Sequence, residues 1–78
     1  MEQGFVLINC DIGAEEYVME ELKLIPQVKN AHVTFGAYDV IAELQAPTSE
    51  EFDQTVSRKI RTISRVESTM TLKVTTSG

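Results

Sequence analysis

The chain has little of what small domains use for covalent or metal reinforcement. Its 78 residues include one cysteine and one histidine. No intrachain disulfide can therefore form, and Cys10 and His32 cannot complete a structural zinc site. A chain of this length makes one domain and buries only about 60–65% of its unfolded surface. We expect its stability to come from close packing and from self-association.

Basic residues and long apolar runs are also scarce. Seven Lys and Arg against twelve Asp and Glu give a net charge of −5, the wrong sign for a general binder of phosphate backbones. The apolar run from Phe5 to Ile8 follows no basic segment and is far shorter than the ~20 residues that cross a membrane. We expect no direct nucleic-acid partner and no membrane partner. A lone free cysteine without an export signal favours a cytoplasmic location.

The usual motifs of catalysis and cofactor binding are missing as well. The sequence has no Cys-x-x-Cys pair, no glycine-rich phosphate loop and no nucleophile elbow. It lacks the aromatic signature of RNA-recognition modules, and no arginine follows the first apolar segment as in acylphosphatases. We therefore expect neither an enzyme nor a resident cofactor or metal.

The first half of the chain predicts a strand, a helix and a hairpin. Residues 5–10 form a short apolar segment rich in β-branched and aromatic residues, which indicates a buried strand. Apolar residues then recur at helical spacing from residue 14, and Pro26 makes this helix end near Leu24. Residues 31–35 alternate between apolar and polar, and the turn at 36–39 leads into another strand at 40–45.

The second half predicts a helix and a last strand. Thr48 and Glu51 have the spacing of a capping box, in which each side chain bonds the other residue's amide. The predicted apolar stripe of this helix consists of Phe52, Val56, Ile60 and Ile63. Residues 66–74 alternate with period two, so that Met70 and Leu72 point opposite to Thr69 and Thr71.

An internal repeat relates the two halves. A shift of about 35 residues lays Phe5-Val6-Leu7 on Val40-Ile41-Ala42 and Glu15-Glu16-Tyr17 on Glu50-Glu51-Phe52. The match resumes after about three extra residues, with Ile25-x-x-Val28 on Ile63-x-x-Val66. Two interleaved βαβ halves predict an α+β ferredoxin-like βαββαβ sandwich, a four-stranded antiparallel sheet with two helices on one face.

Four short motifs in order give a resemblance to a known family. They are Phe5-Val6-Leu7-Ile8, Ile25-Pro26-x-Val28, Gly36-x-Tyr38-Asp39 and Val66-x-x-Thr69-x-Thr71. Together they resemble the effector-binding (RAM) domain of the Lrp/AsnC transcriptional regulators, over nearly the whole chain. Residues 1–78 then form a single RAM-like domain without the DNA-binding helix-turn-helix domain of those regulators.

The resemblance implies an assembly. Domains of this family dimerise through their sheets, form rings of four or five dimers, and bind a small amino acid between dimers as effector. A stand-alone version would modulate transcription by associating with full-length Lrp/AsnC regulators. The residues support the dimer independently, because Phe5 and Leu7 point opposite to Val6 and Ile8 and make the first strand apolar on both faces.

The resemblance also suggests a ligand site, which comprises Gly36, Ala37, Tyr38, Asp39, Thr69 and Thr71. Asp39 offers a carboxylate to an ammonium group, and the two threonines offer hydroxyl donors. Gly36 permits a ligand to approach the backbone closely, and Tyr38 offers an apolar wall with a polar tip. The same residues also suit ordinary roles, since Asp39 is a common turn residue and threonine a common strand residue.

Two other functions remain open from the sequence. One is a dimeric α/β-barrel enzyme of the small monooxygenase or isomerase type, which would need polar company for His32 inside the cleft between sheet and helices. The other is a structural assembly domain without ligand, which is favoured if Tyr38 or Asp39 is engaged only in the turn.

Overall fold

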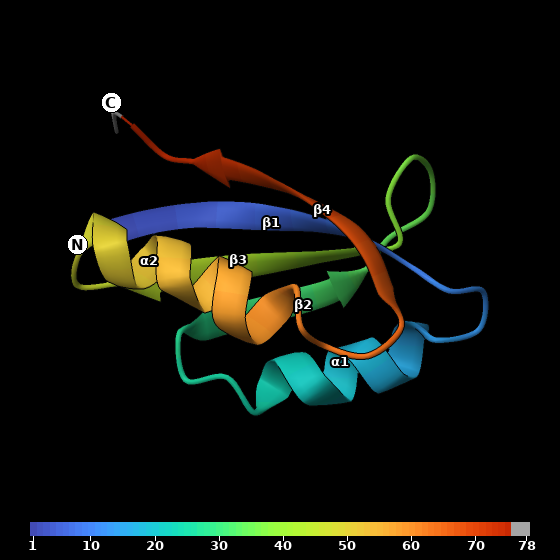
Figure 1. The fold of residues 1–78 in the computed structure, drawn as a ribbon. Coiled ribbons are helices and arrows are strands. Elements are labelled where there is room, and N and C mark those ends of the chain that lie inside the picture. The colour runs from blue at the N-terminus through green and yellow to red at the C-terminus, as the bar shows by residue number, and fades with distance from the viewer. Residues whose placement is uncertain (76–78) are drawn as a thin grey trace.

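The computed structural model, which describes residues 1–75, is a curved sheet with both helices on one face (Figure 1). Its elements are β1 (Glu2–Cys10), α1 (Glu15–Lys23), β2 (Val28–Val33), β3 (Val40–Ala46), α2 (Ser49–Thr55), a π-helical turn η1 (Val56–Ile60) and β4 (Val66–Lys73). The strands lie in the order β2-β3-β1-β4, and every neighbouring pair is antiparallel. The predicted α+β ferredoxin-like sandwich is confirmed.

The core fills the space between the sheet and the helices. In β1 the side chains of Val6 and Ile8 are fully buried, whereas Phe5, which points to the other face, remains 37% exposed. The buried apolar residues are Val6, Ile8, Cys10, Ala14, Val18, Leu22, Ile25, Val40, Ala42, Leu44, Ala46, Phe52, Val56, Ile60 and Ile63. All four residues of the stripe predicted for the second helix are in this core.

β2 and β4 each contain a bulge that the sequence did not predict. β2 runs from Val28 to Val33 instead of 31–35, because a bulge between Val28 and Asn30 lets Val28 pair with Leu44. β4 also begins with a bulge, at the point where Cys10 pairs with Val66. Val66 therefore packs against the core, although strict alternation would place it on the face of Met70.

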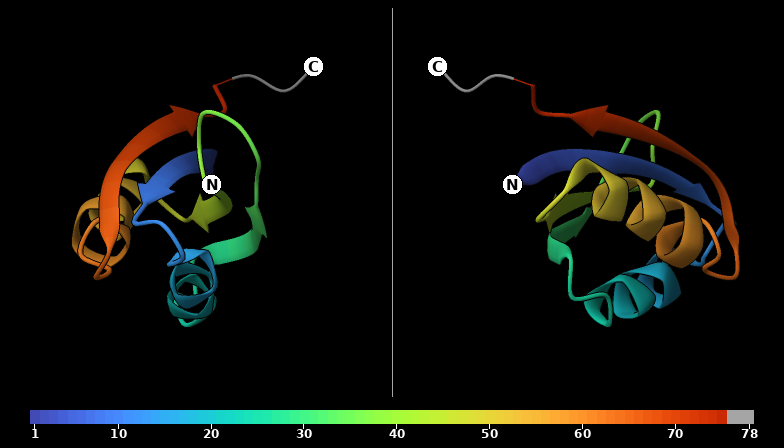
Figure 2. Two further views of the ribbon diagram at one scale, coloured as in Figure 1. Left: turned by 90° about the vertical axis from the view of Figure 1, so that its right-hand side faces the viewer. Right: turned by 60° about the vertical axis from the view of Figure 1, so that its left-hand side comes forward.

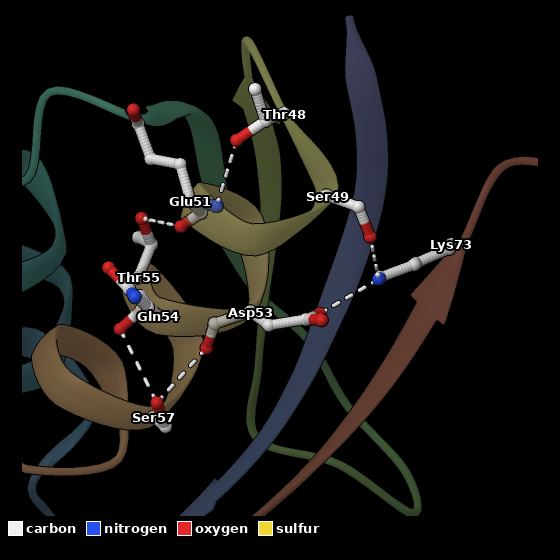
Figure 3. Close-up of polar contacts among 8 residues, drawn as sticks. All are labelled: Thr48, Ser49, Glu51, Asp53, Gln54, Thr55, Ser57 and Lys73. Atoms are coloured by element: carbon white, nitrogen blue, oxygen red, sulfur yellow. Dashed lines mark hydrogen bonds and ion pairs between the residues drawn. The ribbon is translucent and has the colours of Figure 1, made fainter.

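The second helix begins with half of the predicted capping box. The Thr48 hydroxyl accepts a hydrogen bond from the Glu51 amide at 3.1 Å (Figure 3). The Glu51 carboxylate turns away and accepts from Gln27 Nε2 at 3.2 Å, so it ties the helix to the loop before β2. After Thr55 the helix widens into the π turn, closed by the Arg61 amide on the Val56 carbonyl at 2.9 Å. No helix within residues 1–75 has the length and apolarity needed to cross a membrane.

Lys73 connects the end of β4 to the start of α2 (Figure 3). Its ammonium group lies 2.8 Å from Asp53 Oδ1 and 3.0 Å from Ser49 Oγ. It also lies 5.3 Å from the centre of the Phe52 ring, within reach of a cation–π interaction. The edge strand is thus held to the helix layer by one cation with three partners.

We expect Lys73→Met to lower the free energy of unfolding by about 1 kcal/mol, because it removes an ion pair and a cation–π contact while keeping the apolar stem. Lys23→Met is the matched control, since Lys23 has one exposed partner, Glu20 at 3.6 Å. Urea unfolding of both variants measures the difference. Equal losses would show that Lys73 is no more than a solvated surface charge.

Candidate functional site

The hairpin between β2 and β3 projects beyond one end of the sheet (Figure 1). Its bend depends on Gly36, whose φ of +138° lies in a region that side chains rarely adopt. The turn is closed from within, since the Thr34 hydroxyl donates to the Tyr38 carbonyl at 2.7 Å and the Thr34 amide donates to the Asp39 carbonyl at 2.8 Å. Ala37 is exposed at this bend. The sequence placed a turn here, and the structure confirms it.

Asp39 is fixed to the neighbouring strand as well as to the turn. Its amide donates to the Ile8 carbonyl at 2.9 Å, and its Oδ2 accepts from the Cys10 amide at 2.9 Å. Within residues 1–75 its second carboxylate oxygen, Oδ1, accepts no hydrogen bond. One oxygen of Asp39 therefore positions the side chain at the end of β1, and the other is available to a cationic group.

Tyr38 reaches from the hairpin to the far edge of the sheet. Its hydroxyl donates to the Met70 thioether sulfur at 3.4 Å. A thioether is a weak acceptor, so this hydroxyl can be redirected to a better partner at small cost. A domain without a ligand would be favoured if Tyr38 or Asp39 were engaged only in the turn. Both residues instead make contacts outside it, Tyr38 with Met70 and Asp39 with Cys10.

The side chains of Thr69 and Thr71 lie on the face of the sheet that the helices cover. Thr69 pairs with Ile8 and Thr71 with Val6, both of which point toward the helices. Met70 stands between them and points away from the helices, opposite Leu7. Within one chain the structure thus groups the hairpin residues at the end of the sheet and places both threonine side chains on the opposite face from the Tyr38–Met70 contact.

The face away from the helices is apolar at its centre. Its central residues are Phe5, Leu7, Ile41, Met70 and Leu72, which we call the open face. Phe5 is 37% exposed, Met70 49% and Leu72 50%. Apart from the hairpin at one end, no described element covers this face (Figure 2).

Polar pairs surround the open face. Gln45 Nε2 contacts Gln3 Oε1 at 3.4 Å, and Asn9 Nδ2 contacts Ser68 Oγ at 3.5 Å. On the β2 side His32 pairs with Ile41 and therefore faces the same way. An apolar centre with a polar rim is the usual anatomy of a protein–protein interface.

Polar side chains are scarce in the space between the sheet and the helices. Within the described residues Thr55 is the one buried polar side chain, and its hydroxyl donates to the Glu51 carbonyl at 2.8 Å. His32 lies on the opposite face of the sheet. The polar cleft that a barrel-type enzyme would need is therefore missing from residues 1–75.

Sequence reasoning missed an acidic pair, Asp11 and Glu67. The pKa of the Glu67 carboxyl is raised, chiefly because it shares a hydrogen bond with Asp11 and lies near the Asp11 charge, and Asp39 adds to the effect. Burial raises the pKa of the Cys10 thiol, with a contribution from Asp39. Asp11 and Glu67 come from distant segments, and only the bulged pairing of β1 with β4 brings them together.

A ferredoxin-like domain with an uncovered apolar sheet face is typical of association modules. Residues 3–77 match the model of the Lrp/AsnC ligand binding domain, and the chain belongs to this family. The resemblance that its short motifs suggested is thereby confirmed. The family consists of ligand-binding domains of transcriptional regulators, not of enzymes.

The similar proteins agree with this assignment. An uncharacterized HTH-type transcriptional regulator of Pyrococcus furiosus is 32% identical over 72 residues, which cover 88% of this chain and 48% of the relative. The chain thus spans about half the length of that relative. The crystal structure of the protein FFRP-DM1 superposes with a TM-score of 0.92 at 35% identity, covering 96% of this chain and 100% of that one.

A more distant structure contains a ligand. A transcriptional regulator of Neisseria meningitidis, solved as a complex with L-Met, superposes with a TM-score of 0.86 at 16% identity. The match covers 96% of this chain and 50% of that regulator. At this identity the likeness concerns the fold.

Proposed function

We propose that the chain is a non-enzymatic module that senses a small amino acid and controls oligomer assembly in the cytoplasm. It modulates transcription by associating with full-length Lrp/AsnC regulators and does not itself bind nucleic acid. The observation that carries this proposal is the contact of Tyr38 with Met70. It joins the hairpin, where the ligand would bind, to the open face, through which copies would associate.

The open face supports dimerisation. Phe5 pairs with Leu72 and Leu7 with Met70, so apolar side chains from β1 and β4 form one continuous surface. A second copy that presents the same surface removes it from water in a symmetric contact. Such dimers then assemble into a ring of four or five dimers, as the resemblance to the family implies.

The ligand site is proposed to span two copies. The free Oδ1 of Asp39 receives the ammonium group, while the Gly36 and Ala37 backbone and the Tyr38 ring enclose the rest of the amino acid. Thr69 and Thr71 lie on the opposite face of their own sheet, so they serve the hairpin of a neighbouring copy. The L-Met complex of the Neisseria regulator supports an amino acid as the ligand class.

Thermal unfolding in the presence of each of the twenty amino acids tests the proposal. A specific ligand at about 100 times its dissociation constant adds about 2.7 kcal/mol to the stability. We expect Asp39→Asn and Thr71→Val each to remove this gain. Asp39→Asn keeps a side-chain oxygen for the Cys10 amide, so it separates ligand binding from support of the hairpin. Thr75→Val is the control for the second threonine.

Mixing the two variants tests whether the site spans two copies. Asp39→Asn and Thr71→Val chains refolded together would form some sites that contain both wild-type residues. We expect partial recovery of amino-acid binding in the mixture and none in either variant alone. A mixture as inactive as its components would contradict the shared site, and wild-type binding by both pure variants would contradict the site itself.

A further inference from the structure

A groove separates α1 from the edge strand β2, on the side of the sheet that faces the helices. It is open to solvent, has a volume of about 520 Å³ and is lined by Glu16, Tyr17, Met19, Glu20, Lys23 and Val33. None of these residues belongs to the open face or to the proposed ligand site. The groove is therefore separate from both of these surfaces.

The floor of this groove is apolar and partly exposed. Tyr17 is 44% exposed and Val33 53%, and Met19 packs against the core beside them. The Val33 side chain is on the helix side of the sheet because its partner Val40 is fully buried there. Apolar side chains of a partner could contact this floor and remove it from water.

The backbone of β2 offers hydrogen bonds beside the floor. The Thr34 amide donates to the Asp39 carbonyl of the adjoining hairpin, and His32 pairs with Ile41 in the same register. Since amides alternate in direction along a strand, those of Ala31 and Val33 point away from β3. β2 is the last strand on this side of the sheet, so an extended segment can pair with it.

The charge around the groove selects the partner. Glu16 and Glu20 stand on its α1 wall, and the single cation there, Lys23, is already paired with Glu20 at 3.6 Å. A second copy added edge to edge would bring the same carboxylates into the contact, which disfavours self-pairing. A basic segment would instead meet complementary charge in a chain of net charge −5.

We propose that β2 binds an extended segment of another protein as an additional strand. The side chains of this segment that face the groove are alternately apolar, over Tyr17 and Val33, and basic, beside Glu16 and Glu20. This makes the α1–β2 edge a docking site for a basic peptide segment. The proposal does not depend on amino-acid binding.

The test uses an acetylated, amidated peptide of sequence Thr-Val-Thr-Lys-Thr-Val-Thr-Lys, which places valine and lysine on one face of a strand. It is titrated into the full chain, with binding followed by TROSY NMR. We expect saturable shifts at the Ala31 and Val33 amides and at the groove residues. The matched peptide with glutamate in place of lysine should not bind, and N-methylation of the peptide backbone should abolish binding.

Two charge reversals provide the matched control. Glu16 lies in the first turn of α1 and Glu50 in the first turn of α2. Glu16→Lys and Glu50→Lys therefore change the net charge, and the interaction of the side chain with the helix dipole, in the same way. We expect Glu16→Lys to weaken peptide binding at least about threefold, as for loss of an exposed ion pair, and Glu50→Lys to leave it unchanged.

Three results would overturn the proposal. The first is no binding of the lysine peptide. The second is equal weakening by both reversals, which would mean attraction by net charge alone. The third is shifts of the Ala31 and Val33 amides with protein concentration in the absence of peptide, which would assign this edge to a second copy.

Discussion

Leu72→Asp is expected to convert the chain from a dimer or larger assembly into a monomer of 8.7 kDa. Leu72 lies beside Phe5 on the open face and is 50% exposed in the single chain. A second copy on this face would bury the side chain, and an unpaired carboxylate buried there would cost several kcal/mol. Light scattering and sedimentation at micromolar concentration measure the change.

Leu24→Asp is the control for this experiment. Leu24 is 75% exposed at the end of α1, away from the open face, and the chemical change is the same. We expect this variant to keep the wild-type assembly. If Leu72→Asp assembles like wild type, or if wild type is itself a monomer, the open face is not the contact between copies.

Gly4→Ala is expected to lower the free energy of unfolding by about 3 kcal/mol, as for overpacking against a rigid neighbour. An added Cβ would lie 2.8 Å from Phe52 Cζ and 3.1 Å from Lys73 Cα, and it would clash with the Leu72 carbonyl oxygen. The carbonyl belongs to the backbone, so β4 itself would have to move. Urea unfolding measures the loss.

Gly13→Ala separates crowding from backbone strain. Gly13 has a φ of +83° and no atom within 4 Å of an added Cβ. An alanine there should cost only about 1 kcal/mol, the penalty of a left-handed residue. Equal losses of unfolding free energy in the two variants would mean that crowding between β1 and β4 does not cause the effect of Gly4→Ala. A smaller assembly in Gly4→Ala would further show that β4 has shifted on the open face.

Sequence patterns were sufficient for the fold because the helices are amphipathic and each strand is a short segment bounded by turn residues. The stripe from Phe52 to Ile63 identifies the buried face of the second helix. The repeat of the two halves then leaves few topologies. The family followed from short motifs, whose order reflects the same βαββαβ arrangement.

The irregularities could not be predicted in the same way. The bulges at Val28 and at Val66 depend on which neighbour each strand pairs with, and a local pattern contains no such information. The sequence offers the Glu51 carboxylate a local partner, the Thr48 amide. In the folded chain it accepts instead from Gln27 Nε2 at 3.2 Å, a residue 24 positions earlier in the sequence that a local pattern does not identify.

The candidate site shows the same division. The turn chemistry of Gly36 and Asp39 is local and was predicted from the residue types. The separation of Thr69 and Thr71 from the Met70–Tyr38 contact follows from alternation, which the sequence also contains. The contacts of Tyr38 with Met70 and of Asp39 with Cys10 are long-range, so only the folded chain reveals that the hairpin is attached to both β1 and β4.

Because of the π turn, the helix of the second half of the chain is longer than the helix of the first half, although both pack on the same sheet. α1 has nine residues, whereas α2 with its seven continues through the five of η1. The widened turn accommodates added length while Ile60 and Ile63 stay buried. An insertion in this helix can therefore be absorbed without changing the strand register. The open face can keep the approximate symmetry of the repeat, while the helix layer is free to diverge and to distinguish one such domain from another.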